Sequence, residues 1–137
     1  MHALRAPGLH VVASPEAIDR ATWRDDGPGP DEFEPLVLRL APDDALVIGA
    51  TGVEIDDPHA IVEREVGYMA LMFPADEFVD SVVPHLEWPP SVERPAFAQG
   101  AIAGVPAKLY IDSTGAAIVF ILASYADDFF SRVQVAG

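Results

Sequence analysis

The side chains with the most versatile chemistry in this sequence are four histidines, because imidazole both binds metals and transfers protons near neutral pH. They are scattered along the chain as His2, His10, His59 and His85. No two of them have the spacing H-x-x-x-H, which places two imidazoles on one face of a helix where they can hold zinc. We therefore predict no histidine metal site.

Short acidic runs are a second source of chemistry, since carboxylates serve as metal ligands and as general acids and bases. The runs are Asp43-Asp44, Asp56-Asp57-Pro58-His59 and Asp127-Asp128. An acidic stretch before a proline is typical of a solvated turn, and acid–base catalysis needs carboxylates at a defined separation around a pocket. We interpret the runs as two turns and a polar helix face, and we predict no catalytic residue.

Motifs for nucleophiles and nucleotides are also missing from the sequence. None of the six serines lies in G-x-S-x-G or S-x-x-K, and the glycines form neither G-x-G-x-x-G nor a P-loop. The chain has no cysteine, which excludes disulfides and thiolate metal sites and is typical of a reducing cytosol. We therefore expect a cytoplasmic protein with no cofactor-binding or metal site of its own, and leave open whether it belongs to an enzyme complex.

Charge and length narrow the classes of partner. The chain has 137 residues, the size of one domain, and a formal net charge of -14 from 22 acidic against 8 basic residues. Its single lysine, Lys108, leaves no basic stripe for nucleic acid or an anionic membrane, and no apolar run approaches the ~20 residues of a spanning helix. We expect one domain, residues 1–137, with one core.

Half of the residues are apolar, an unusual share beside so large a one-signed charge. Part of this apolar surface could face a protein partner or a second copy of the chain, or a small β-rich core could absorb all of it. The candidate interface residues are aromatic: Tyr68, Trp88, Phe129 and Phe130.

The first half of the chain predicts a strand, a helix and a hairpin. Ser14-Pro15-Glu16 is typical of a helix start, and the helix is expected to reach about Trp23. Residues 24–35 are rich in Asp, Gly and Pro, which predicts a mobile loop. Apolar runs predict strands at 9–13, 36–40 and 45–49, the last two joined by a turn at 41–44.

The second half predicts a buried central strand at 66–73, then a helix that Pro84 kinks or ends, then strands at 101–103, 107–111 and 117–122. A last helix, from Tyr125 to Val133, is expected to turn Phe129, Phe130 and Val133 inward. This order lacks the strict alternation of a parallel βαβ fold. We predict a single α+β domain, a largely antiparallel sheet with two or three helices packed on it.

Four stretches of the second half carry a family resemblance. They are residues 67–78, 97–100, 102–109 and 123–130. They resemble the gamma subunit of heterotetrameric sarcosine oxidase, which belongs to the wider fold group of the glycine-cleavage T-protein and its folate-binding relatives.

The resemblance implies an α+β domain that packs against a large flavin- and folate-handling subunit and binds no cofactor itself. In the T-protein pattern a paired aspartate follows a glycine turn and a strand, and the equivalents after Gly115 are Val119 and Phe120. The resemblance thus implies that the catalytic carboxylate is lost.

Three functions remain open. The first is a non-catalytic small subunit of a flavin- or folate-linked amine-oxidising or demethylating complex, held by a larger protein. The second is a stand-alone acidic binding or inhibitor-type protein, which its charge would steer onto a basic partner. The third is a small enzyme or folate-binding protein whose pocket a homodimer assembles from residues distant in sequence.

Overall fold

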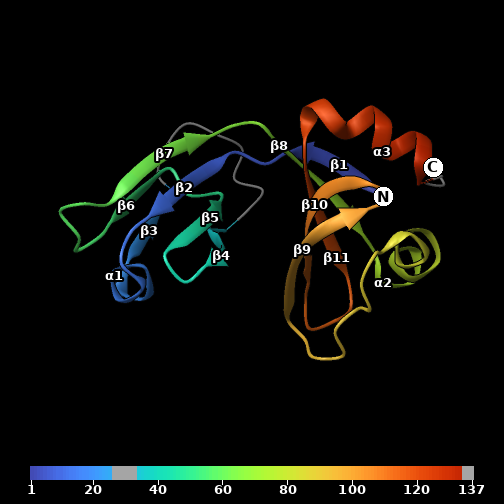
Figure 1. Cartoon of the computed structure of the whole chain (residues 1–137), viewed down its shortest axis with the longest axis horizontal. Helices are drawn as coiled ribbons and strands as arrows, with labels where there is room; N and C mark the ends of the chain where they lie inside the picture. Colours follow the sequence, from blue (N-terminus) through green and yellow to red (C-terminus); the bar gives the residue numbers. More distant parts are fainter. Residues whose placement is uncertain (26–33, 134–137) are drawn as a thin grey trace. The chain divides into compact units, whose positions relative to one another are not determined.

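The computed structural model describes residues 1–25 and 34–133, and it confirms the α+β class with antiparallel sheets. The chain forms two compact units (Figure 1). Unit 1 combines Met1–Arg5 with Tyr68–Gly137, and unit 2 is Ala6–Gly67. Most of the predicted mobile loop, residues 26–33, lies outside the described residues.

Unit 2 is built on a four-stranded antiparallel sheet in the order β4-β5-β2-β7, with the pair β3-β6 as a second small sheet. Alternate residues of β2 and β5, such as Leu9, Val11 and Val47, turn to one face and pack there with Ile18 of the helix α1. The elements are β2 (Gly8–Val12), α1 (Pro15–Arg20), β3 (Thr22–Arg24), β4 (Leu36–Ala41), β5 (Asp44–Ile48), β6 (Gly52–Glu54) and β7 (Ile61–Glu65).

The start of α1 agrees with the prediction from the sequence, but its end does not. Ser14 caps the helix, since its hydroxyl accepts a hydrogen bond from the backbone N–H of Ala17 at 3.3 Å. The prediction that the helix reaches Trp23 is wrong, because the backbone of Ala21 is extended and Trp23 pairs with Val53 in the β3-β6 sheet. An aromatic residue next to a threonine favours a strand, and the partner strand decides the outcome.

Unit 1 is built on a five-stranded antiparallel sheet in the order β1-β8-β11-β10-β9. The predicted strand at 66–73 is β8, which pairs with a neighbour on both sides. The strand predicted at 117–122 is confirmed with its bounds, the one at 107–111 begins two residues earlier, and the one at 101–103 is the end of a longer strand. The strands are β1 (His2–Arg5), β8 (Tyr68–Phe73), β9 (Ala96–Ile102), β10 (Val105–Ile111) and β11 (Ala117–Leu122).

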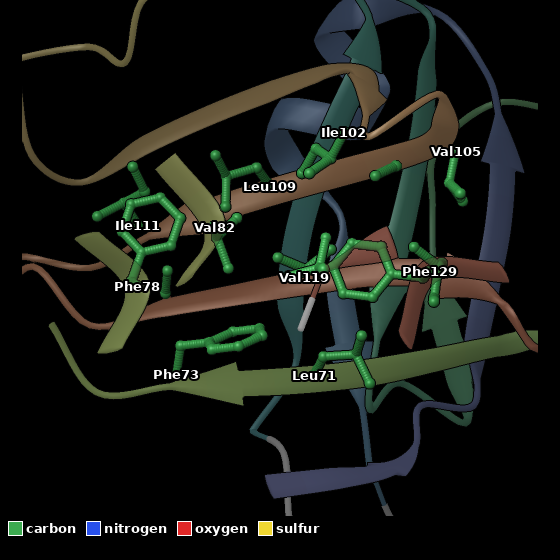
Figure 2. Close-up of a cluster of buried hydrophobic side chains, with 14 residues drawn as sticks. Leu71, Phe73, Phe78, Val82, Ile102, Val105, Leu109, Ile111, Val119 and Phe129 are labelled. Carbon is green, nitrogen blue, oxygen red and sulfur yellow. The ribbon is translucent and has the colours of Figure 1, made fainter. Parts of the chain in front are cut away.

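The helical segments of unit 1 supply the second layer of its core. The segment after Pro74 begins as α2 (Ala75–Glu77), widens into a π-helical turn (Phe78–Val82) and ends as a 3-10 turn (Val83–His85) that contains Pro84. A second 3-10 turn (Ala123–Tyr125) leads into α3 (Ala126–Arg132). Figure 2 shows Phe78, Val82 and Phe129 among strand residues such as Leu71 and Val119.

One core was expected, whereas most of the buried apolar side chains form two clusters, one in each unit. Four observed strands, β1, β3, β6 and β7, were not predicted from the sequence. β3, β6 and β1 have only three or four residues each, and β7 is charged and exposed, so none of them shows the apolar run of a buried strand. These strands form because a neighbour supplies the hydrogen bonds.

We predict that Gly8→Ala destabilises unit 2, because a Cβ at Gly8 would lie 2.2 Å from the carbonyl oxygen of Val47 on the paired strand. Backbone cannot yield as a side chain does, so we expect a loss of about 1–3 kcal/mol in the free energy of unfolding, measured by chemical denaturation. Gly52→Ala is the matched control, since its Cβ would meet only the flexible Arg24 side chain at 3.2 Å. Equal stabilities of the two variants would contradict this packing.

Candidate binding groove on the five-stranded sheet

The candidate site lies on the face of the unit 1 sheet opposite to its helical segments. In β8, β10 and β11 the odd-numbered residues face the helical segments and the core, so the even-numbered residues face away from them. The register places one residue of every strand in a single row across this open face. The row runs His2, Met72, Ile118, Tyr110 and Phe97.

The row is apolar except for His2 and is incompletely covered, although Ala70 and Phe120, farther along β8 and β11 on the same face, are fully buried. His2 is exposed, and Met72, Ile118, Tyr110 and Phe97 are half-buried. Neighbouring strands are about 4.8 Å apart, so five strands carry the row over roughly 19 Å. We call this row of five residues the open-face row.

A groove of about 430 Å³ lies at one end of unit 1, where β8 ends and β11 begins. This volume is within the range of small-molecule sites, about 300–1,000 Å³. Met72, Ile118 and Tyr110 of the open-face row line it together with Phe73. Its charged or hydrogen-bonding side chains are His2, Tyr110 and Asp112.

Asp112 opens the turn between β10 and β11 and is held there by Thr114. One carboxylate oxygen, Oδ1, accepts hydrogen bonds from the backbone N–H of Thr114 at 2.8 Å and from its hydroxyl at 2.5 Å. The Thr114 hydroxyl is the main reason that the pKa of Asp112 is lowered from its ordinary value of 3.8, and backbone N–H groups of the turn add to it. Asp112 is therefore an ionised carboxylate at neutral pH, at a fixed place beside the groove.

The other charges near the groove are already paired. The amino group of Met1, which also lines the groove, donates to both carboxylate oxygens of Glu77 at 2.9 and 2.7 Å. No lysine or arginine lines the groove among the described residues. Asp112 also lines the groove, and it takes part in none of the ion pairs found among the described residues.

The four predicted interface residues do not gather at one place. Tyr68 opens β8, and its ring lies under the ammonium group of Lys108 at 5.4 Å. Trp88 packs over Gly100 of β9 and lines a smaller hollow of about 130 Å³. Neither of them lines the groove.

Phe129 and Phe130 differ in burial. Phe129 is 0% exposed and lies in the core of unit 1, so it has no surface to offer a partner, and its place among the interface candidates is corrected. Phe130 is half-buried and packs on the edge of this core. The two rings meet edge to face, with centroids 6.1 Å apart.

The acidic stretch at Asp56-Asp57-Pro58-His59 forms a turn, as expected. The carboxylate of Asp57 accepts hydrogen bonds from the backbone N–H groups of Ser14 and His59, both at 2.8 Å. The bond from Ser14 is the main cause of the lowered pKa of Asp57. Asp57 therefore ties the turn to the start of α1, and in the part of the chain that the structure describes no three potential metal ligands gather at one point.

The groove was not predicted from the sequence, although the sequence contains one signal for it. In Lys108-Leu109-Tyr110-Ile111, the alternation that sends Leu109 and Ile111 to the core must send Tyr110 to the other face. The neighbours of Tyr110 in the row, Met72 and Ile118, depend on strand pairing, which the order of residues does not reveal.

Comparison with known proteins adds no relative: no family model, curated protein or solved structure matches this chain. Within the described residues, none of the helices has both the length and the apolar character needed to span a membrane.

We predict that Phe129→Ala lowers the free energy of unfolding by about 3–5 kcal/mol, as is usual for a buried phenylalanine. Phe130→Ala is the matched control, because it loses the same ring–ring contact from a half-buried position, and its cost should be at most about half as large. Chemical denaturation compares the two. A larger loss for Phe130→Ala would show that the assignment of the inner ring is wrong.

We also predict a pH signature for Asp57. Its pKa is lower in the folded chain than the ordinary 3.8, so the folded state resists protonation and the stabilisation is present above about pH 4. It is lost as the pH falls through the folded-state pKa. The difference in unfolding free energy between the wild type and Asp57→Asn should therefore be larger at pH 7 than at pH 3.

Asp56→Asn is the control for the Asp57 prediction, since it removes the same charge from an exposed neighbour that makes neither hydrogen bond. Its effect on stability should be smaller at pH 7. If Asp57→Asn and Asp56→Asn follow the same pH curve, the hydrogen bonds to Asp57 do not stabilise the fold.

Proposed function

We propose that this chain is a non-catalytic small subunit that binds a larger protein through the open-face row of the unit 1 sheet. The observation that carries the proposal is the open-face row, an apolar row that crosses all five strands on the side away from the helical segments of unit 1. A standard interface buries about 800 Å² on each partner, and a row about 19 Å wide fits within such a patch.

We further propose that the larger protein is the flavin- and folate-handling subunit of a cytoplasmic amine-oxidising or demethylating complex. One feature supports this. The four stretches that carry the resemblance to the sarcosine oxidase gamma subunit, residues 67–78, 97–100, 102–109 and 123–130, fall in unit 1 except for Gly67, which adjoins it. They form β8 and parts of β9, β10 and α3, so the resemblance lies within one structural unit and includes Met72 and Phe97 of the open-face row.

A stand-alone acidic binding protein is the second candidate, and the formal net charge of -14 favours it. Such a charge raises the rate of encounter with a basic partner in a salt-dependent way. The same face would then bind a basic protein that carries no cofactor. The two candidates differ in the partner, which the following experiment identifies.

The experiment uses the tagged full chain to capture its partner from an extract of its native host. We expect the wild type to retain a larger protein that shows a flavin absorbance band, and Ile118→Glu to lose it at least tenfold. Ile118 is half-buried at the centre of the open-face row, where a charge would have to be desolvated on binding.

Ile61→Glu is the matched control, because Ile61 lies on β7 of unit 2 and is 56% exposed. It should bind as the wild type does, and circular dichroism should show all variants folded. If Ile118→Glu does not fold, Phe97→Glu on the edge strand β9 repeats the test at the end of the row.

Three outcomes would count against the proposal. Capture of nothing by the wild type overturns the subunit proposal. Loss of binding in Ile61→Glu but not in Ile118→Glu assigns the interface to unit 2. Capture of a basic protein without flavin, still sensitive to Ile118→Glu, overturns the oxidoreductase partner in favour of the acidic binding protein.

A further inference from the structure

The groove beside Asp112 has a definite chemical preference, and this preference does not depend on the proposed partner. Its walls are mostly apolar, from Met72, Pro74 and Ile118, so they suit the hydrocarbon part of a ligand. Its polar groups are few, which is typical of a site where one or two contacts set the orientation of the ligand. The charge of those groups therefore decides what binds.

We propose that the groove binds an organic ammonium: a small apolar body that carries one cationic nitrogen, with the nitrogen at Asp112 and the body against Tyr110, Ile118 and Met72. The carboxylate supplies a charge-assisted hydrogen bond and the apolar walls bury the hydrocarbon.

The sign of the charge follows from the ion pairs around the groove. The amino group of Met1 is matched by Glu77, so that pair contributes no net charge. Asp112 adds one negative charge, and its lowered pKa keeps that charge at neutral pH. A carboxylate or phosphate ligand would meet this charge without a lysine or arginine to offset it among the lining residues.

The geometry of Asp112 makes it suitable as a receptor. Both hydrogen bonds from Thr114 converge on Oδ1, so the carboxylate is oriented before a ligand arrives. Such preorganisation reduces the entropy that binding would otherwise cost.

An aromatic ring adds to the preference for a cation. Tyr110 lines the groove, and the face of a tyrosine ring attracts an ammonium group within about 6 Å of its centre. The same sheet already holds one such pair, the ammonium of Lys108 at 5.4 Å from the ring centre of Tyr68. Tyr110 offers the groove a second ring of this kind.

The test is a titration of the isolated full chain, followed by NMR or calorimetry, with three probes of one size: benzylamine, benzyl alcohol and benzoate. At pH 7 benzylamine is protonated, and we expect it to bind about tenfold or more tightly than benzyl alcohol, while benzoate should not bind. Chemical-shift changes should fall on Tyr110, Asp112 and Ile118.

Two variants and one control separate the contributions of the charge and of the aromatic ring. Asp112→Asn keeps an oxygen that can accept the hydrogen bonds of Thr114 but removes the charge, so benzylamine should bind about tenfold more weakly. Asp128→Asn removes an equal charge from an exposed site on α3 and should leave the affinity unchanged. Tyr110→Leu should weaken benzylamine more than benzyl alcohol, because it removes the ring but keeps an apolar wall.

The source of the ammonium is settled by a second arm with N-acetyl-lysine amide and N-acetyl-arginine amide. Tighter binding of either than of benzylamine identifies the ligand as a cationic side chain of a protein, and weaker binding identifies it as a free amine. Either result supports the ammonium site. Equal binding of benzylamine and benzyl alcohol, or no effect of Asp112→Asn, would overturn it, and neither result bears on whether Ile118→Glu releases a protein partner.

Discussion

Antiparallel pairing of five strands is the constraint on which unit 1 depends. Because side chains alternate along a strand and paired residues share a face, the register of β8, β10 and β11 assigns every residue of the sheet either to the helical layer or to the open face. Val119 and Leu109 go to the core for the same reason that Ile118 and Tyr110 go to the open face. A slip of one residue in β11 would turn Val119 out of the core and Ile118 into it, so the core and the candidate site are specified by one set of backbone hydrogen bonds.

The sheet also shows how unit 1 draws on distant parts of the chain. β1, from the first residues of the sequence, pairs with β8 some seventy positions later, and the Met1–Glu77 ion pair fastens the same end. His2 reaches the groove only through this pairing. Contacts of such sequence separation cost loop-closure entropy, which the hydrogen bonds of β1 and the apolar contacts of Met1 with the core help to offset.

The sequence predicts those features of the fold that depend on a few neighbouring residues. The cap at Ser14, the apolar runs of β8 and β11 and the turn at Asp112 each depend on a few neighbouring residues, and the structure agrees with them. β1 and β7 carry no apolar run and exist because a neighbouring strand offers hydrogen bonds, so no local pattern marks them. No local pattern predicts the division into two units either, because unit 1 combines two segments that are far apart in the sequence. For the site, alternation in β10 indicates that Tyr110 leaves the core, but only the strand order brings Met72 and Ile118 beside it.

The distribution of charge connects the groove to the composition of the whole chain. The chain has 22 acidic against 8 basic residues, and among the described residues the ion pairs that involve an arginine or the terminal amino group are Met1–Glu77, Arg24–Glu54 and Arg39–Asp19. Exposed carboxylates on a surface are screened by salt and have little effect on the stability of the fold. A carboxylate beside an apolar groove is different, because the walls exclude part of the water that would screen it. Asp112 is a place where hydrocarbon and a carboxylate meet, and the organic ammonium proposed above offers a counterpart to both.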